Sequence, residues 1–445
     1  MKTILILNAK IVNENKIIEG DIFVKDQKID RIDKNLSHLK ADIIIDSKEN
    51  FVFAGVIDDQ VHFREPGLTH KASIYTEAKA AVAGGVTSFM EMPNTVPNAL
   101  TQDLLAQKYQ RASEVSLANY SFFMGVGNNN LEEALKTDIK NVCGLKIFMG
   151  SSTGNMLVDN PTTLETIFRE ANLLIATHCE DEITIKNNVE RFKELYGENP
   201  NASVHPQIRN EKACFLSSSL ASVLAKKYNT RLHILHLTTT DELNLFTNQI
   251  PLKEKRITSE VCVHHLWFSS DDYAVLGNQI KCNPAIKDKR HQDSLWKALL
   301  DDRLDIIATD HAPHTWEEKQ QNYWNAPAGL PLIQFSLSMM LEKVKEGKIT
   351  IEKMVEKMCH APAICFQIEK RGFLREGYFA DIVIVDSNAP FEIKKEDIEY
   401  KCKWSPLENK TLSSKVTHTI VSGHLVYENG QFNETKKGER LVFER

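Results

Sequence analysis

Short apolar stretches of β type recur through the middle of the chain, and segments with helical spacing separate most of them. Lys71–Ala83 places apolar residues on one helical face and stops at Gly84-Gly85, and Glu211–Tyr228 and Asp288–Asp301 follow a similar pattern. The expected strands are Phe51–Ile57, Val86–Met92, Tyr120–Val126, Gly144–Phe148, Leu173–His178, Arg231–His236, Arg256–Val261 and Asp305–Thr309. A doubly wound sheet also alternates in this way, but no glycine-rich phosphate turn follows the first strand. Eight strands alternating with helices therefore predict an α/β protein built on a (β/α)8 TIM barrel.

The two ends of the chain are rich in short strands and carry few helical patterns. The expected terminal strands are Ile4–Leu7, Asp21–Lys25, Lys28–Ile32, Ile43–Asp46, Asp381–Asp386, Val416–Val421 and His424–Glu428. We expect one small β-sandwich domain from both termini, residues 1–52 plus 366–445, and a hydrolase barrel over residues 53–365. The charged segment Lys436–Arg440 is expected to be a solvated tail.

Composition narrows the class of partner. Hydrophobic residues make up 42% of the 445 residues and charged residues 26%, which is typical of a globular protein. The formal charge of −6 gives no reason to expect nucleic acid or an anionic membrane as a partner. No apolar stretch approaches the length of a membrane span. A small-molecule substrate is the expected partner.

The eight cysteines are scattered, and none forms a C-x-x-C pair. In a chain of this length the pattern indicates reduced thiols in a cytoplasm and argues against a disulfide framework. It also argues against a zinc site built from thiolates. Any metal must then be held by histidine, by carboxylate or by a modified lysine.

Polar side chains occur where the predicted barrel strands end, which is where barrel enzymes place their active sites. Four strands end near His62, His178, His236 and Asp310, and a fifth contains Lys146. A single histidine at a strand end is usually only a hydrogen-bonding residue, so the argument rests on all five facing one end of one barrel. A buried lysine is costly, so Lys146 is expected to be deprotonated, modified, or paired in a salt bridge with a barrel carboxylate.

These residue types suit a hydrolytic zinc centre. Zinc prefers imidazole nitrogen and carboxylate oxygen, and an open coordination position binds water. The metal lowers the pKa of that water to about 7 and so provides hydroxide at neutral pH. A lysine carboxylated by CO₂ is an anion able to bridge two zinc ions. Asp310 is the natural group to accept the water proton and pass it to a leaving nitrogen.

Several sequence blocks resemble the amidohydrolase superfamily over almost the whole chain, and within it the dihydroorotases with a composite β domain, close to the hydantoinase and allantoinase branch. The blocks that carry the resemblance are Val61-His62-Phe63-Arg64-Glu65-Pro66-Gly67, Glu91-Met92-Pro93-Asn94-Thr95, His178-Cys179-Glu180, Ile234-Leu235-His236-Leu237-Thr238-Thr239, Lys281-Cys282-Asn283-Pro284-Ala285 and Ala308-Thr309-Asp310-His311-Ala312-Pro313-His314. The last of these, together with Arg64-Glu65-Pro66-Gly67, is specific to this group and is not a general barrel feature.

The resemblance implies a role for each matching residue. His62, Lys146, His178, His236 and Asp310 would bind one or two zinc ions, with Lys146 carboxylated and Asp310 also acting as general base and acid. Arg64 and Asn94 would hold a substrate carboxylate. The residues implied to contact the substrate ring are Asn283, His314, Ala328 and Gly329. The implied reaction is the reversible interconversion of L-dihydroorotate and N-carbamoyl-L-aspartate in pyrimidine synthesis, by a cytoplasmic homo-oligomer, a dimer or a tetramer.

Gln60 departs from the pattern of the family, which usually has His-x-His on the first strand. Residues two apart on a strand share a face, so Gln60 should still point toward the site. An amide is a much poorer zinc ligand than imidazole, so Gln60 either coordinates weakly through its carbonyl or only forms hydrogen bonds. The nearby His264 and His265 are expected to be structural.

Two other functions remain open at the level of sequence. Another cyclic amidase, such as a hydantoinase, dihydropyrimidinase or allantoinase, would share the zinc ligands but would not need the guanidinium of Arg64. The structural alternative for Arg64 is a salt bridge to Glu65 or Asp58. A catalytically silent scaffold subunit is the second alternative, and only Gln60 favours it. The segment Trp316–Ala328 is either a lid or a surface loop.

Overall fold

The barrel predicted from the alternating pattern is the centre of the computed structural model, which describes residues 2–150 and 156–445. Over these residues the barrel strands are β6 (Val56–Val61), β7 (Val86–Glu91), β8 (Asn119–Phe122), β9 (Met124–Gly125), β10 (Leu145–Phe148), β11 (Ile175–His178), β12 (Leu232–Ile234), β13 (Ile257–Cys262) and β14 (Ile306–Ala308). Neighbouring strands are parallel in the orders β6-β7-β8 and β9 through β14, and β8 and β9 are separated only by Phe123. The ring closes where Val61 forms a parallel bridge with His311 and the His62 amide donates to the His311 carbonyl at 2.7 Å.

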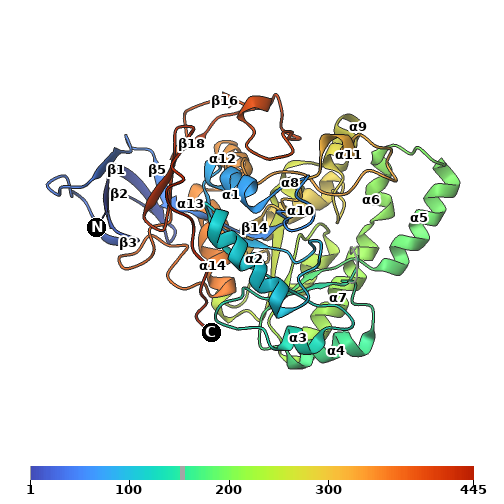
Figure 1. The fold of residues 1–445 in the computed structure, drawn as a ribbon. Helices are drawn as coiled ribbons and strands as arrows, with labels where there is room; N and C mark the ends of the chain where they lie inside the picture. The colour runs from blue at the N-terminus through green and yellow to red at the C-terminus, as the bar shows by residue number, and fades with distance from the viewer. Residues whose placement is uncertain (1, 151–155) are drawn as a thin grey trace.

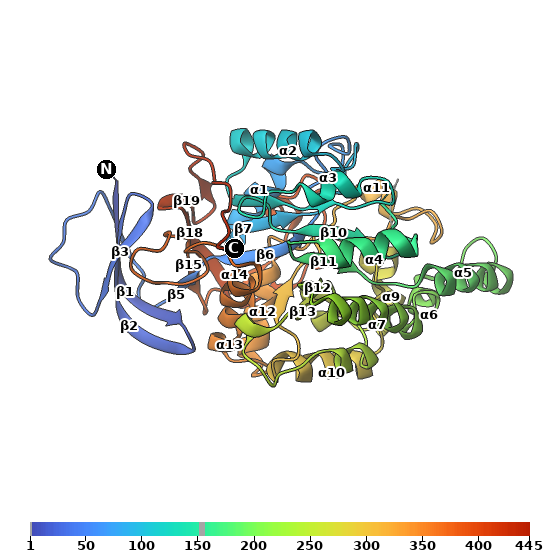
Figure 2. The same ribbon diagram turned by 90° about the horizontal axis from the view of Figure 1, so that it is seen from below.

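Helices surround the strands on the outside of the barrel (Figures 1 and 2). The longer helices are α1 (Ile74–Ala83), α2 (Gln102–Val115), α4 (Pro161–Glu170), α5 (Glu182–Tyr196), α7 (Glu211–Tyr228), α10 (Lys289–Leu300) and α12 (Ser336–Lys345). The shorter ones are α3 (Leu131–Leu135), α6 (His205–Ile208), α8 (Val263–Trp267), α9 (Tyr273–Leu276), α11 (Trp316–Lys319), α13 (Ile351–Val355) and α14 (Ala361–Phe366). The three predicted helices are confirmed as α1, α7 and α10. Their first turns are capped by the side chains of Ser73, Asn210 and Asp288.

Both ends of the chain form one nine-stranded sheet. Its strands are β1 (Thr3–Asn13), β2 (Lys16–Lys25), β3 (Lys28–Asp33), β4 (Ile43–Asp46), β5 (Phe51–Ala54), β15 (Ile382–Asp386), β18 (Lys415–Val421), β19 (His424–Glu428) and β20 (Gln431–Phe432). The strand order is β20-β19-β18-β15-β5-β1-β2-β3, with β4 beside β1. The antiparallel pairing of β5 with β15 joins the two ends, and a separate hairpin pairs β16 (Phe391–Glu392) with β17 (Thr411–Leu412).

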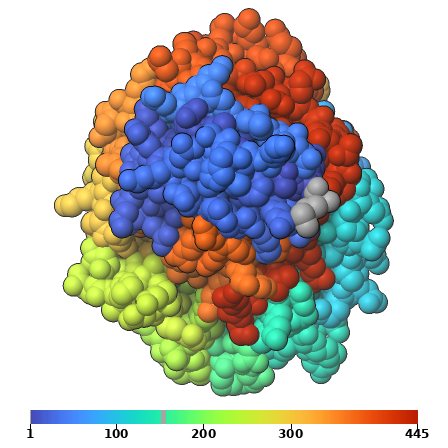
Figure 3. Space-filling view, turned by 90° about the vertical axis from the view of Figure 1, so that its left-hand side faces the viewer, coloured from blue at the N-terminus to red at the C-terminus, as the bar shows by residue number. Residues whose placement is uncertain are grey.

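Figure 3 shows the blue N-terminal residues at one end of the molecule, bordered by orange and red C-terminal segments. The fold is therefore a TIM barrel with a β-sandwich domain made from both termini, as the sequence predicted. The limits proposed for the two domains stay a prediction. No helix of the described residues is both long and apolar enough to cross a membrane.

The predicted first barrel strand, Phe51–Ile57, is wrong in its bounds. The apolar run divides at Gly55, where β5 leaves the terminal sheet and β6 enters the barrel. A Cβ at Gly55 would lie 2.1 Å from the side chain of Thr87, so glycine is needed for this close passage. Both halves of the run are apolar and buried, although they belong to different sheets. The hydrophobic pattern therefore does not mark the division between them.

The C-terminal segment is not the solvated tail that its charges predicted. Lys436 is exposed and Lys437 is partly buried, but the Glu439 carbonyl accepts a hydrogen bond from the Tyr120 amide at 3.0 Å. Beyond it, Leu441 and Phe443 are buried against the barrel. The alternation of Leu441 and Phe443 outweighs the preceding charges, because it gives this segment an apolar face.

Candidate active site

One cavity of about 480 Å³ opens at the carboxyl ends of the barrel strands. All twelve predicted site residues line it: Gln60, His62, Arg64, Asn94, Lys146, His178, His236, Asn283, Asp310, His314, Ala328 and Gly329. The lining residues that the sequence did not single out are Phe148, Leu157, Glu182, Arg209, Ala312 and Pro327. The strand-end argument thus located a single cavity.

His178 and His236 form an apposed pair of imidazoles in this cavity. His178 Nδ1 lies 2.9 Å from His236 Nε2. The other nitrogen of His178, Nε2, lies 3.0 Å from Glu180 Oε2, so it carries the proton and leaves the Nδ1 lone pair toward His236. His236 Nδ1 is buried and has no hydrogen-bond partner. With His178 Nδ1 as the acceptor, His236 Nε2 is the donor of this N–H···N hydrogen bond, and both imidazoles line the cavity.

Glu180 fixes that orientation through a third residue. The guanidinium of Arg209 forms an ion pair with Glu180 Oε2, the same oxygen that meets His178. Burial raises the pKa of Glu180, but the charge of Arg209 and the contact with His178 outweigh burial and lower that pKa to about 2. Glu180 therefore stays anionic and keeps the proton on His178 Nε2.

His62 and Asp310 also line the cavity and contact each other. His62 Nε2 lies 3.0 Å from Asp310 Oδ1, and His62 Nδ1 lies 2.7 Å from the amide oxygen of Asn94. The Nδ1 proton is thus assigned to the Asn94 contact, and Nε2 is left as an acceptor or ligand. Gln60 Nε2 donates to the same Asp310 oxygen at 3.1 Å. Gln60 is therefore part of the site through its N–H group.

Lys146 is 1% exposed and forms no ion pair with any carboxylate of the described residues. Its Nζ lies 4.4 Å from the ring centroid of Phe148. Burial lowers the pKa of Lys146 to about 7, because desolvation disfavours the ammonium form. The salt bridge considered from the sequence is absent, and the deprotonated or modified forms remain.

Arg64 does not form either salt bridge considered from the sequence. Its Nε donates to the Pro313 carbonyl at 3.1 Å, and its NH2 lies 3.1 Å from His314 Nε2. Glu65 instead pairs with Arg111, and Asp58 accepts the hydroxyl of Thr309. Among the described residues no carboxylate lies within ion-pair distance of the Arg64 guanidinium, and burial lowers its pKa to about 10. This buried cation at the cavity wall is suited to an anionic ligand.

Three of these residues hold the left-handed backbone conformation that non-glycine residues rarely adopt. The φ angles are 68° at Arg64, 41° at His236 and 48° at Asp310. Such conformations cost roughly 1–3 kcal/mol each and persist where the surrounding structure enforces them. All three lie just beyond a strand end, where the backbone turns to aim the side chain into the cavity.

The segment Trp316–Ala328 is anchored by a buried lysine. Lys319 Nζ donates to the carbonyls of Lys281, Pro327 and Gly329, at 3.2, 2.9 and 2.8 Å. These bonds tie the segment to the loop before Asn283 and to the cavity wall at Ala328 and Gly329. Of this segment, Pro327 and Ala328 line the cavity.

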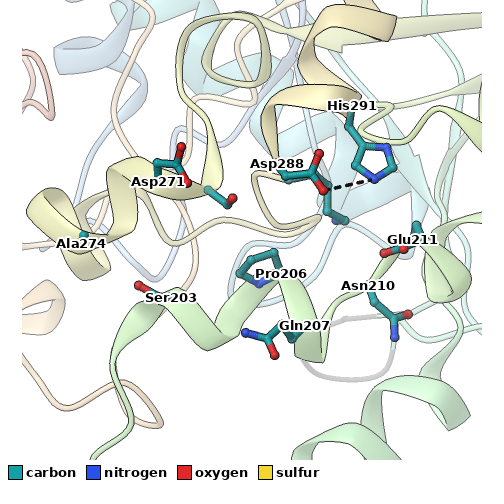
Figure 4. Close-up of a pocket in the computed structure, with 11 residues that line it drawn as sticks. Ser203, Pro206, Gln207, Asn210, Glu211, Asp271, Ala274, Asp288 and His291 are labelled. Atoms are coloured by element: carbon teal, nitrogen blue, oxygen red, sulfur yellow. Dashed lines mark ion pairs between the residues drawn. The ribbon is translucent and has the colours of Figure 1, made fainter.

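A second, larger cavity of about 740 Å³ lies beside helices α6 and α9 (Figure 4). Asp288 and His291 face each other there, with Oδ2 and Nε2 4.0 Å apart, and Glu211, Asn210 and Gln207 border it. None of the predicted site residues lines it. We take the smaller cavity as the candidate active site, since it combines the imidazoles, the unpaired Lys146 and Asp310.

In residues 2–150 and 156–445, two compact groups of buried potential metal ligands lie outside the predicted set: Cys262, His264 and His265, and Asp59, His233 and Glu260. In the second group His233 Nε2 lies 3.2 Å from Asp59 and 3.3 Å from Glu260. Burial alone would lower the pKa of His233, but these carboxylates raise it well above its usual value. Burial and the charge of Asp59 raise the pKa of Glu260 well above its usual value, so protonated His233 and one carboxylate balance each other without a metal. Sequence reasoning gave no metal role to either group.

A closed barrel with a terminal β domain and a cavity of imidazoles, lysine and aspartate defines a barrel hydrolase. The model of the amidohydrolase family matches residues 51–426, and the chain belongs to this family. It is 34% identical to a dihydroorotase of Pyrococcus abyssi over 99% of both chains, and 29% identical to a dihydroorotase of Methanosphaera stadtmanae over 96% of both. Among solved structures it resembles an L-hydantoinase (dihydropyrimidinase) from Arthrobacter aurescens, with a TM-score of 0.92 and 27% identity over 97% of this chain and 98% of that one. Enzymes of this family are typically metal-dependent.

Proposed function

We propose that this protein is a dihydroorotase, which interconverts L-dihydroorotate and N-carbamoyl-L-aspartate in pyrimidine synthesis. The observation that carries the proposal is the buried Arg64 guanidinium, which lines the cavity without a carboxylate partner among the described residues. Dihydroorotate has a ring carboxylate to pair with it, whereas hydantoin and dihydrouracil have none. The dihydroorotases among the relatives support the same reading.

The donor set fits zinc, which we propose as the metal, with one or two ions in each chain. Lys146, His178 and His236 would hold one ion, since His178 Nδ1 and His236 Nε2 face each other and Lys146 has no ionic partner among the described residues. His62, Asp310 and Lys146 would hold the other, with Lys146 carboxylated. Gln60 is the weak position of that second set, because its N–H group is engaged with Asp310.

Zinc bound at these residues would supply a water with a pKa of about 7 and would polarise the amide carbonyl. Asp310 is the general base: its carboxylate accepts the water proton and then donates it to the leaving ring nitrogen. The amide N–H of Gln60 donates to Oδ1 of Asp310 and so orients the carboxylate.

Substrate binding would use other residues that line the cavity. Arg64 pairs with the ring carboxylate, and Asn94, whose oxygen already accepts from His62, contributes its amide N–H groups. Contacts to the ring are proposed for Asn283, His314, Ala328 and Gly329, all of which line the cavity.

The test is zinc content per chain measured together with turnover of three rings: dihydroorotate, hydantoin and dihydrouracil. We expect zinc in the purified chain and kcat/KM highest for dihydroorotate. A hydantoinase is the second candidate, because the solved structure with a TM-score of 0.92 is one. Preference for an uncharged ring would support that candidate, and zinc without turnover of any ring would support a silent scaffold subunit.

We further propose that the chain works as a homo-oligomer, a dimer or a tetramer, in the cytoplasm. All eight cysteines are free thiols, which suits a reducing compartment. Helix α7 exposes Phe215, Leu216, Leu220 and Val223 on one side, and an apolar strip of this kind suits a contact between subunits. Light scattering of the purified chain tests the oligomeric state.

A further inference from the structure

A cluster of soft metal-ligand atoms lies at the end of β13, next to the proposed zinc site but outside it. Cys262, His264 and His265 are buried, and one ligand atom of each lies within 4.8 Å of the others. They occupy a Cys-x-His-His stretch that passes from the last residue of β13 into helix α8. Neither the catalytic proposal nor the substrate contacts use them.

The imidazoles in this cluster lack the hydrogen bonds that burial normally requires. Within the described part of the chain, neither ring nitrogen of His264 has a hydrogen-bond partner, and the same is true of His265 Nδ1. The backbone at Thr309 is near enough to His264 to influence its protonation, but no hydrogen bond of normal geometry forms. Buried polar atoms without partners are rare in native proteins, and a ligand that fills their lone pairs is one cause.

Gln60 supplies a fourth atom to the same place. Its amide nitrogen donates to Asp310, and its carbonyl oxygen lies 3.8 Å from Cys262 Sγ. In a tetrahedral zinc site, bonds of about 2.3 Å to sulfur and about 2.1 Å to oxygen place those two atoms about 3.6 Å apart. The sulfur–oxygen separation in the structure is close to that value.

We propose that Cys262, His264 and His265 bind a divalent transition metal of the zinc class, with the Gln60 carbonyl oxygen as fourth ligand. On binding, the thiol S–H bond is replaced by a sulfur–metal bond, and the proton is released to solvent, so no oxidant or reductant is needed. The nitrogen and sulfur atoms must approach from within 4.8 Å to about 3.4–3.6 Å of one another, a shift of about an ångström.

This site gives a physical reason for the amide at position 60. The amide oxygen of Gln60 faces the Cys262 thiol, while its N–H group donates to Asp310. A histidine at this position could not make the same two contacts, because an imidazole has no carbonyl oxygen. His265 Nε2 lies 3.2 Å from the Pro284 carbonyl, next to Asn283 in the cavity wall. A metal here would brace both the first strand and the loop that carries Asn283. The scattered cysteines gave no sign of it in the sequence.

Cobalt substitution of the full-length protein tests the proposal. Cobalt bound to a thiolate absorbs strongly in the near ultraviolet through sulfur-to-metal charge transfer, whereas the proposed catalytic ligands contain no sulfur. We expect this band in the cobalt-loaded wild-type protein, and its loss in Cys262→Ser together with about one equivalent of cobalt. The matched control is Cys359→Ser, whose buried thiol donates to the Ala54 carbonyl and should leave the band unchanged.

A cobalt-loaded wild-type protein without the band overturns the proposal, and so does a band that survives in Cys262→Ser. The wild-type spectrum decides the question even if that variant fails to fold. His264→Asn keeps the thiol and is expected to lose the same equivalent of metal, and full retention counts against the site. The charge-transfer band does not depend on turnover. A band in a chain that does not turn over dihydroorotate supports this metal site and counts against the dihydroorotase proposal. An active chain without the band supports the dihydroorotase proposal and counts against this metal site.

Discussion

Replacing Arg64 with methionine keeps the apolar stem of the side chain and removes its charged guanidinium. In the structure the guanidinium is buried and bonds only to neutral groups, the Pro313 carbonyl and His314. Its charge is therefore available to the substrate carboxylate. A bidentate pair provides two hydrogen bonds to charged groups at about 1.5–2 kcal/mol each, so about 3–4 kcal/mol is lost. At 1.36 kcal/mol for each factor of ten, kcat/KM for dihydroorotate should fall roughly 150- to 900-fold.

The assay is the ring opening of dihydroorotate, with dihydrouracil measured as a competitor in the same reaction. Dihydrouracil lacks the carboxylate, so its inhibition constant should change less than about tenfold, which is below about 1.4 kcal/mol. Arg111→Met is the matched control, because Arg111 is half exposed and pairs with Glu65 at the surface. Equal losses for the two ligands, or an equal loss in the control, would refute the carboxylate contact.

The remaining predictions concern the proton, the metal and the core. Asp310→Asn should fold with a nearly unchanged Tm and lose about 10²–10⁴ in kcat, since an amide cannot carry the proton; near-normal turnover would contradict the general-base role. Glu180→Gln should weaken zinc binding about 10–100-fold in a chelator competition, because His178 loses its anionic acceptor, while exposed Glu170→Gln should not. Chelation should abolish turnover and added zinc should restore it; activity that persists without metal would exclude the metal-dependent mechanism. Lys108→Met should lower the free energy of unfolding by about 3–5 kcal/mol, because it leaves the buried Glu91 carboxylate without the Lys108 ammonium, whose Nζ lies 2.9 Å from Glu91 Oε2. The same change at exposed Lys136 should cost under about 1 kcal/mol, and equal effects in denaturant titrations would contradict this view of the core.

The general architecture and the location of the cavity were predictable from the sequence. Alternation of apolar runs with helical patterns identifies the barrel, and the rule that sites lie at the carboxyl ends of strands gathers His62, Lys146, His178, His236 and Asp310 in one place. The division of Phe51–Ile57 was not predictable, because burial in two different sheets leaves one continuous apolar run. The charges of Lys436–Arg440 led to the wrong prediction of a solvated tail, because the apolar alternation of Leu441 and Phe443 that follows them is short.

The supporting contacts of the site also lay beyond sequence reasoning. Arg209 reaches Glu180 from a different segment of the chain, and only the folded barrel brings them together. Cys262 and Gln60 are neighbours although 202 positions separate them. Positive φ at His236 and Asp310 was not predictable either: histidine and aspartate adopt it more often than most residues, but only a small share of them do so. Such features depend on strand register, which the pattern of apolar positions does not specify across a barrel.

The pairing of β5 with β15 has a consequence for the order of events during synthesis. Phe51–Ala54 leaves the ribosome long before its partner Ile382–Val385, so β5 waits as an open edge while the barrel is being made. An unpaired strand edge invites pairing with other chains, so the nascent chain is exposed to aggregation throughout this interval. A chain that terminates before Ile382 never closes that edge. Nonsense mutations that leave the whole cavity intact should therefore still produce insoluble protein.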